Sequence, residues 1–265
     1  MRSKLRAATI ALMFLLLGGL LAGCSAATPA PTPTPLTSGV QYFTMDGDRL
    51  VTVHVPAHHN GPAPLVLVLH EWPGNGAMAM GYGFDPLVDT KGFVAVYPDG
   101  LDGQWDSGAA DDVKFLSSVV KQVEARTKID PKRVYATGFS SGARMSYRLA
   151  CDTDLFAAIA PIAGEVEFPC DHPVAASVMH VHGLADTTNA LDSSADDPWR
   201  KADGCEPPTV TQSGGIHRSI ADCKHGRSVE LVTIDGLGHA IPWAISQGFD
   251  TGSEIWAFFA AHPNR

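Results

Sequence analysis

The chain has 265 residues, of which 45% are hydrophobic and 18% are charged, and this composition suits one globular domain with an ordinary core. Its formal net charge of −9 argues against nucleic acid and against an anionic membrane surface as the partner. No internal repeat is visible along the sequence, so a repeat architecture is not expected.

Residues 1–23 are predicted to be a signal peptide rather than part of the fold. A basic start precedes an apolar run over 10–21, which is too short to be a comfortable membrane span. The run leads through Leu-Ala-Gly into Cys24 and resembles a bacterial lipobox, so we expect Cys24 to be lipidated and to begin the mature protein. An ordinary cleaved secretory signal is the alternative. Residues 24–39 are rich in proline and threonine and predict an extended linker that holds the domain off the membrane.

The folded domain is predicted to span residues 40–265 and to begin with a hairpin. Two strands at 41–44 and 49–55 flank an Asp-Gly turn. Apolar runs typical of buried strands follow at 65–70, 93–97, 134–137, 156–162, 178–182 and 229–234. Helical spacing predicts helices over 112–128, with Asp111 or Asp112 as the N-cap, and over 253–261. Strands that alternate with helices predict a doubly wound, mostly parallel sheet in a single α/β domain.

Four further cysteines lie in the predicted domain, which favours disulfides in an exported protein. Four cysteines allow three connectivities. We favour Cys151–Cys170 and Cys205–Cys223, because each pair closes a short loop within one region. No Cys-x-x-Cys spacing occurs, so a zinc site is not expected.

One stretch carries a chemical signature, a Gly-x-Ser-x-Gly turn from Gly138 to Gly142 that lies between a predicted strand and a predicted helix. A serine at the tip of such a turn exposes its hydroxyl, and the small flanking residues let strand and helix approach each other. The first N–H groups of a helix are unpaired, so that of Ser141 can bind a developing oxyanion. The motif is short and also arises by chance in glycine-rich chains, but the flanking elements favour Ser140 as a nucleophile.

A serine hydroxyl needs a base to become nucleophilic, and the base needs an acid to orient it. In open α/β sheets with this turn, the acid and then the histidine follow the serine, at the carboxyl ends of later strands. Asp186 follows the predicted strand at 178–182 and is therefore the candidate acid. Asp192, Asp196 and Asp197 lie further along the same loop and are expected to be solvated.

The candidate base is His239, which directly follows a predicted strand and has glycines beside it that let the backbone turn sharply. His217 and His225 lie in a polar stretch, and His262 lies in the terminal helix. Asp235 is too close in sequence to His239 to serve as its acid from a separate strand.

The loop after the first central strand is predicted to supply a second oxyanion donor, the backbone N–H of Glu71 or Trp72. His70 is expected to organise this loop by hydrogen bonding rather than to act as a base. His180 and His182 share one face of a predicted strand, which is compatible with a metal site, but we expect two structural histidines near the site.

Four tryptophans are candidates for an aromatic wall against the substrate: Trp72, Trp105, Trp199 and Trp243. Trp72 has the best position, because it adjoins the predicted oxyanion loop. For each of them, packing in the core or in a loop is the alternative.

Several segments carry a resemblance to a known family: LVLVLH (65–70), YPDGLDGQW (97–105), DDVKFL (111–116), IDPKRVYATGFSSGARMSYRLACD (129–152), LFAAIAPIAG (155–164), HVHGLAD (180–186) and DGLGH (235–239). They resemble the secreted esterases grouped with polyhydroxybutyrate depolymerases and feruloyl esterases, within the α/β-hydrolase fold. The resemblance implies Ser140 as nucleophile, Asp186 as acid and His239 as base. Two positions depart from it: Glu71 stands where the family commonly has glycine, and Ala-Ile-Pro-Trp follows His239 where Thr-Trp-Pro is common. Both line the expected place of the acyl or alcohol group, so the resemblance does not fix the substrate.

The resemblance implies a serine carboxylic-ester hydrolase that forms an acyl-enzyme on short-acyl, aryl or polyester substrates, and the lipobox-like start places it in the bacterial cell envelope. We expect it to act without a cofactor, as a monomer anchored by its N-terminal lipid. The alternatives are an acyltransferase to an envelope glycan and a non-catalytic envelope-binding protein of the same fold.

Overall fold

The computed structural model describes residues 33–59, 61–243 and 248–264. The predicted signal peptide, the predicted lipidation site at Cys24 and most of the predicted linker lie outside the described residues. From Pro33 onward, the described residues belong to one compact unit.

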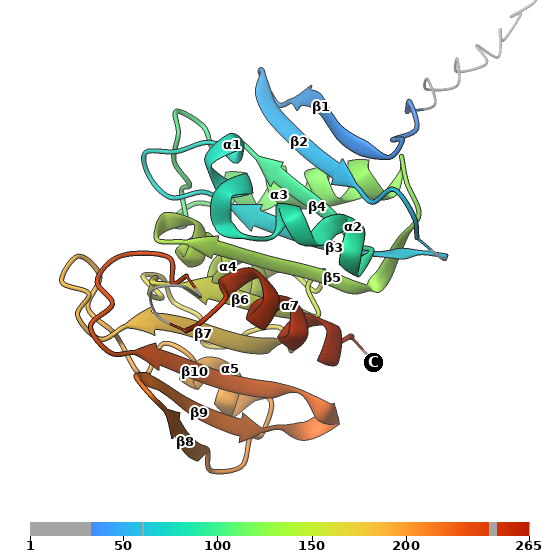
Figure 1. Ribbon diagram of the computed structural model, residues 1–265. Coiled ribbons are helices and arrows are strands. Elements are labelled where there is room, and N and C mark those ends of the chain that lie inside the picture. Colours follow the sequence, from blue (N-terminus) through green and yellow to red (C-terminus); the bar gives the residue numbers. More distant parts are fainter. Residues whose placement is uncertain (1–32, 60, 244–247, 265) are drawn as a thin grey trace, which may run out of the picture. The chain divides into compact units, whose positions relative to one another are not determined.

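The described part of the chain forms one ten-stranded sheet in the order β1-β2-β4-β3-β5-β6-β7-β10-β9-β8 (Figure 1). Its strands are β1 (Gly39–Met45), β2 (Arg49–Val55), β3 (Ala63–Leu69), β4 (Val94–Pro98), β5 (Ile129–Phe139), β6 (Ala158–Ile162), β7 (Ser177–Gly183), β8 (Thr209–Ser213), β9 (Ile216–Asp222) and β10 (Ser228–Ile234). The central strands from β4 to β10 pair in parallel, and the two strands at each edge pair antiparallel. The predicted mostly parallel sheet is therefore confirmed.

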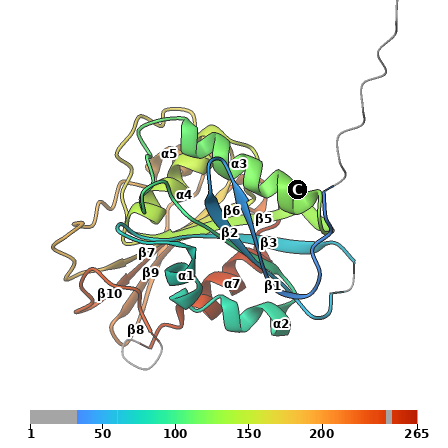
Figure 2. The same ribbon diagram turned by 90° about the horizontal axis from the view of Figure 1, so that it is seen from above.

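Helices cover both faces of this sheet, with α3, α4 and α5 on one side and α1, α2 and α7 on the other (Figure 2). Their bounds are α1 (Gly76–Ala79), α2 (Val88–Lys91), α3 (Asp111–Glu124), α4 (Ser141–Asp152), α5 (Asp197–Ala202) and α7 (Thr251–Ala261), with short 3₁₀ helices η1 (Met80–Tyr82), η2 (Asp85–Leu87) and η3 (Lys224–Gly226). None of the helices in the described ranges combines the length and the apolar character that crossing a membrane requires.

Strand β3 shows why the central strands read as uninterrupted apolar runs. Leu65, Leu67 and Leu69 pack into one buried cluster, and Val66 and Val68 pack into the other. Successive side chains of a strand point to opposite faces, so two cores need apolar residues at every position. Every residue of β3 is accordingly buried.

The predicted N-cap of α3 was wrong. The helix begins at Asp111 with Ala110 as the N-cap, and it ends at Glu124 rather than at 128. Asp112 lies in the first turn, where its Oδ1 is 2.7 Å from Arg49 Nη1 and its Oδ2 accepts the N–H of Asp106. The carboxylate of Asp112, which the local sequence predicts to be a helix cap, therefore pairs with the buried Arg49 of β2 instead.

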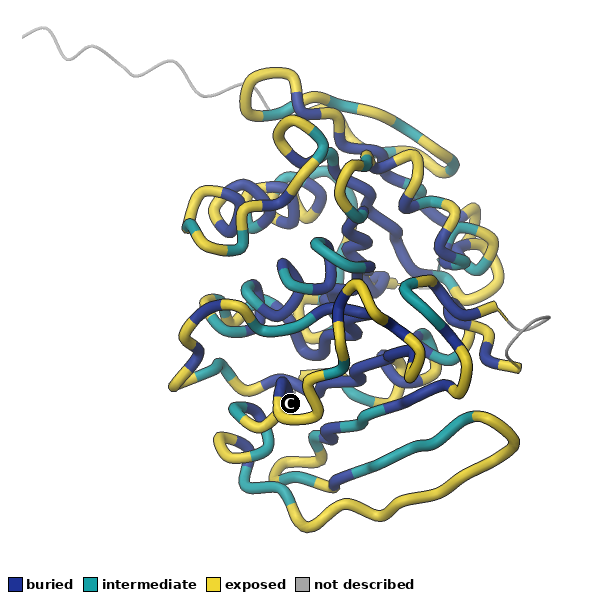
Figure 3. The backbone as a smooth tube through the Cα atoms, turned by 90° about the vertical axis from the view of Figure 1, so that its left-hand side faces the viewer, coloured by how far each residue is buried: buried dark blue, intermediate teal, exposed yellow. Residues whose placement is uncertain are grey.

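The antiparallel hairpin of β8 and β9 was not predicted. Every residue of β8 is exposed, and β9 is mostly half-buried (Figure 3). A strand that buries neither face shows no alternation of apolar and polar residues, so its sequence lacks the signal that marks the central strands.

The two favoured disulfides, Cys151–Cys170 and Cys205–Cys223, are both present. The first links α4 to the segment after β6. The second links the segment after α5 to the residue after β9. Each closes a loop of fewer than twenty residues, with sequence separations of 19 and 18.

Candidate active site

Ser140 lies at the tip of the turn between β5 and α4, in the backbone conformation φ 55°, ψ −114°. Such a conformation is rare for a residue with a side chain, and the neighbouring glycines make it possible. A Cβ atom at Gly142 would lie 2.3 Å from the carbonyl oxygen of Leu69, and one at Gly138 would lie 2.6 Å from Gly142. The turn is therefore as tight as the sequence motif predicts.

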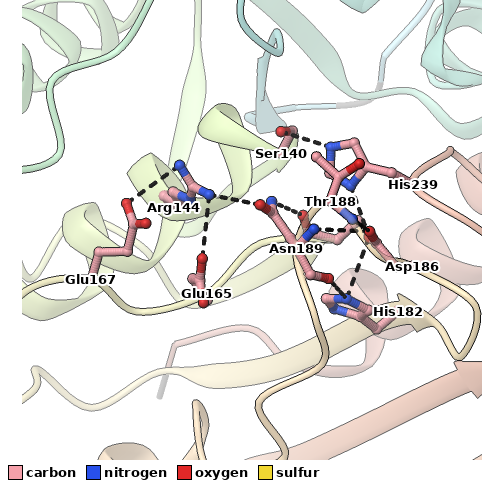
Figure 4. Close-up of polar contacts among 10 residues, drawn as sticks. Ser140, Arg144, Glu165, Glu167, His182, Asp186, Thr188, Asn189 and His239 are labelled. Atoms are coloured by element: carbon pink, nitrogen blue, oxygen red, sulfur yellow. Dashed lines mark hydrogen bonds and ion pairs between the residues drawn. The ribbon is translucent and has the colours of Figure 1, made fainter.

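The structure brings Ser140, His239 and Asp186 together (Figure 4). His239 Nε2 lies 2.9 Å from Ser140 Oγ, and His239 Nδ1 lies 2.7 Å from Asp186 Oδ2. The ring of Phe139 packs against the ring of His239, with centroids 4.8 Å apart. The three side chains come from the carboxyl ends of β5, β7 and β10, which lie at the same edge of the sheet. This geometry suits a hydroxyl activated by an imidazole that a carboxylate orients.

The carboxylate of Asp186 is buried, yet its pKa lies below the ordinary value. Burial alone would raise this pKa, because it disfavours the charged form. The hydrogen bond from His239 and the N–H groups of Asn189 and Thr188, each 2.9 Å from Oδ1, together outweigh burial. An ionised Asp186 can accept an N–H from His239 Nδ1, and in that tautomer Nε2 is the acceptor that faces Ser140 Oγ.

Asn189 is a site residue that the sequence did not reveal. Its N–H donates to Asp186, its side-chain amide donates to the carbonyl of Ala163, and its Oδ1 accepts from Arg144 at 2.8 Å. Arg144, on α4, also pairs with Glu165, and this cluster is visible beside the Asp186 contacts in Figure 4. A polar residue in a loop carries no periodicity, so no sequence signal marked this junction.

The loop after β3 is organised by His70, as expected. Its Nε2 accepts the N–H of Gly100 at 2.8 Å, and its Nδ1 lies 2.7 Å from the carbonyl oxygen of Glu71. Burial is the main cause that lowers the pKa of His70, so the ring is held neutral. The N–H of Glu71 donates to the hydroxyl of Tyr82 at 3.1 Å, which engages one of the two predicted oxyanion donors.

The candidate tryptophans divide into exposed and buried residues. Trp72 and Trp243 are 63% and 46% exposed. Trp105 was a candidate for the substrate wall with packing as the alternative. Its ring packs against His70, and its Nε1–H donates to the carbonyl of His70 at 2.9 Å. Trp199 is fully buried and packs against Tyr147. Only the first pair can offer aromatic surface to a ligand.

His180 and His182 lie in the core with their rings in contact, since His180 Nε2 is 3.0 Å from His182 Nδ1. Asp196, expected to be solvated, is buried and faces His180. Across the described residues, no group of three or more His, Cys, Asp or Glu side chains could hold a metal ion.

Comparison with known proteins finds esterases by family model, by sequence and by structure. The family model described as Esterase PHB depolymerase matches residues 53–224. A probable feruloyl esterase C of Aspergillus flavus is 29% identical over 231 residues, which cover 81% of this chain and 84% of that protein. Feruloyl esterase C of Emericella nidulans is 27% identical over 247 residues, covering 85% of this chain and 88% of that protein. Among solved structures, an acetyl xylan esterase from Aspergillus awamori superposes with a TM-score of 0.68 at 18% identity, covering 84% of this chain and all of that one.

Proposed function

The chain belongs to the esterase PHB depolymerase family and is a serine carboxylic-ester hydrolase, and from that premise we propose that Ser140, His239 and Asp186 form its catalytic triad. The observation that carries this proposal is the 2.9 Å separation between His239 Nε2 and Ser140 Oγ. Such a distance lets the imidazole take the hydroxyl proton as Ser140 attacks the ester carbonyl.

In the proposed reaction, His239 first acts as the base and then returns its proton to the departing alcohol. Asp186 stabilises the imidazolium that forms between these steps, and its low pKa supports this role. The acyl group remains on Ser140 Oγ until water, activated by the same imidazole, releases it. No cofactor enters any of these steps.

The proposed oxyanion hole consists of the backbone N–H groups of Ser141 and Trp72. Ser141 is the first residue of α4, and the first N–H groups of a helix have no partner within it. Glu71 and Trp72 were both candidates for the second donor. The bond from the Glu71 N–H to the Tyr82 hydroxyl favours Trp72, whose N–H follows it in the same loop.

We propose aryl and short-acyl esters of carbohydrates as the substrate class. The names of the relatives, feruloyl esterases and an acetylxylan esterase, support this class, as do the exposed rings of Trp72 and Trp243. Polyester chains are the competing substrates, because the family model carries the polyhydroxybutyrate name. Methyl ferulate, p-nitrophenyl acetate and a polyhydroxybutyrate suspension, assayed side by side, separate the two.

We further propose that the protein is exported and anchored through lipidated Cys24. The basic start, the apolar run and the lipobox-like residues before Cys24 support this location. Replacing Cys24 by alanine should move the protein from the membrane fraction to the soluble fraction, and mass spectrometry of the mature N-terminus identifies the lipid. An unchanged membrane fraction would contradict the anchor.

The triad is tested by replacing Ser140 with alanine and measuring turnover of p-nitrophenyl acetate. We expect kcat to fall by about a thousandfold or more, as when other serine hydrolases lose the nucleophile. Ser141→Ala is the matched control, because it removes a neighbouring hydroxyl but keeps the backbone N–H. Wild-type activity in the Ser140→Ala variant would contradict the assignment of Ser140 as the nucleophile. Labelling of Ser140 by a fluorophosphonate probe distinguishes an enzyme from a non-catalytic binding protein, and acylation of an added glycan would indicate transfer rather than hydrolysis.

A further inference from the structure

Behind Asp186, a row of buried polar side chains continues that the proposed mechanism does not use. His182 Nε2 lies 3.5 Å from Asp186 Oδ2, and His182 Nδ1 lies 3.0 Å from His180 Nε2. His180 Nδ1 lies 3.6 Å from Asp196 Oδ2, and Asp196 Oδ1 accepts the hydroxyl of Tyr147 at 2.8 Å. We call these four residues, His182, His180, Asp196 and Tyr147, the buried polar row.

The buried polar row has almost no access to solvent. His180 is 0% exposed, and His182 and Asp196 are each 1% exposed. The aromatic ring of Tyr147 stands edge-on to His180, with centroids 5.9 Å apart. Donors and acceptors inside such a site must match each other, because an unpaired buried polar atom destabilises the folded protein.

The proton positions in the buried polar row follow from matching each donor to an acceptor, starting at His182, the member nearest Asp186. The carbonyl oxygen of Asn189 can only accept, and it lies 2.8 Å from His182 Nε2, so this nitrogen carries a proton. Burial is the main cause that lowers the pKa of His182, which keeps the ring neutral. Its Nδ1 is then an acceptor, and His180 Nε2 must carry the proton that lies between the two rings.

The same reasoning leaves one proton to be assigned at the far end. Burial raises the pKa of Tyr147 well above its ordinary value, so its hydroxyl stays protonated and donates to Asp196. Among the residues that the structure describes, none is a hydrogen-bond partner of His180 Nδ1. If neither this nitrogen nor Asp196 Oδ2 carried a proton, two electron pairs would face each other in a dry site. Among the other charged groups near Tyr147, the charge of Asp192 also raises the pKa of its hydroxyl, and the charge of Arg200 lowers it.

We propose that one of two atoms that face each other at 3.6 Å, His180 Nδ1 and Asp196 Oδ2, carries a proton, and that these two residues are positioning residues that act with the Asn189 carbonyl to hold His182 as its Nε2–H tautomer. The proposal rests on the proposed function, since its consequence is exerted through Asp186. In this tautomer the N–H of His182 faces both the Asn189 carbonyl and the Asp186 carboxylate. In the other tautomer, an electron pair on Nε2 would face both oxygens and oppose the ionised form of Asp186.

The proton positions are tested directly by ¹⁵N NMR of the histidine rings in the full folded chain. We expect His182 to be protonated on Nε2 and not on Nδ1, and His180 Nε2 to be protonated. A proton on His182 Nδ1 would overturn the proposal. The same spectrum is expected for Ser140→Ala, so this outcome does not depend on whether Ser140 is the nucleophile.

Two double variants test the positioning role. His180→Gln with Asp196→Asn removes the ionisable pair but keeps an amide donor that can reach His182 Nδ1. His180→Leu with Asp196→Asn removes that donor as well. We expect the glutamine variant to keep kcat within about threefold of wild type. We expect the leucine variant to lose about tenfold in kcat at similar KM. This loss is small beside the roughly ten-thousandfold loss of kcat that follows when the catalytic histidine itself has the wrong tautomer.

Equal kcat values in the two double variants would reject the positioning role. Near-ultraviolet circular dichroism checks that both variants fold. If the leucine variant does not fold, two other measurements still test the positioning role. One is the tautomer of His182 in the wild-type spectrum. The other is the kcat of the glutamine variant, because a tenfold loss there also contradicts the proposal.

Discussion

Asp186 and His239 are 53 residues apart in the chain, yet the carboxylate oxygen Oδ2 of the first lies 2.7 Å from the ring nitrogen Nδ1 of the second. Replacing Asp186 by asparagine keeps the shape of this contact but offers an N–H where the ring needs an acceptor. We expect kcat for p-nitrophenyl acetate to fall by about a thousandfold to ten-thousandfold, because the ring then favours the wrong tautomer.

The chain offers a matched control for that variant. Asp235 also contacts a histidine, with Oδ1 3.0 Å from His217 Nε2, but this pair is exposed. An exposed pair contributes little, so Asp235→Asn should change the free energy of unfolding by less than about 0.5 kcal/mol and leave kcat within about twofold. A large loss in Asp235→Asn with little loss in Asp186→Asn would reverse the assignment of the acid.

Stability should fall as the pH drops below the ordinary histidine value of 6.5, because burial lowers the pKa of His70, His182 and His262. In that range the unfolded chain binds protons that the folded protein excludes, so the free energy of unfolding rises with pH. Urea unfolding at about pH 7.5 and about pH 5 measures the difference. His70→Gln, which can still accept the Gly100 N–H, should show a smaller difference, and equal midpoints at both pH values in wild type would contradict this account.

Trp72 and Trp105 should respond differently to substitution. Trp72 is mostly exposed, so Trp72→Ala should raise KM for an aryl ester by severalfold and leave the melting temperature nearly unchanged. Trp105→Phe removes the donor to the His70 carbonyl, which should cost about 1–3 kcal/mol in the free energy of unfolding. Ester kinetics and thermal melts on both variants check this, and a large melting shift in Trp72→Ala would place that ring in the packing instead.

The Cys205–Cys223 disulfide closes a loop whose ends are 18 residues apart. In the chain-entropy model, a loop of this length contributes about 3 kcal/mol to the free energy of unfolding. In the double variant Cys205→Ser with Cys223→Ser, the free energy of unfolding should fall by about 3 kcal/mol, so the urea midpoint should be lower. A reductant should destabilise this variant further only by breaking Cys151–Cys170. A urea midpoint equal to that of wild type would contradict a stabilising role for Cys205–Cys223.

The sequence predicts those parts of the fold whose signal is local. Strand β3 is recognisable because helices on both faces require an apolar residue at every position. The turn at Ser140 is recognisable because only glycine fits at Gly138 and Gly142. Asp186 and His239 follow from chain order and from their places after buried strands.

Other features depend on partners that are distant in sequence and could not be read from it. Asp112 looked like a cap until Arg49, 63 residues away, was seen to bind its carboxylate. Trp105 looked free to face a ligand, but His70 lies against its ring. Strand β8 is exposed along its whole length and β9 is mostly half-buried, so no alternation of apolar and polar residues marks this hairpin.

Both disulfides are local, and neither ties the segment that ends at Ser140 to the segment that carries His239, although these residues are 99 apart. Assembly of the reactive centre is therefore left to the noncovalent order of β5, β6, β7 and β10. An oxidising environment therefore reinforces the packing around α4, α5 and β9, whereas the contact between His239 and Ser140 depends on the packing of the central strands alone.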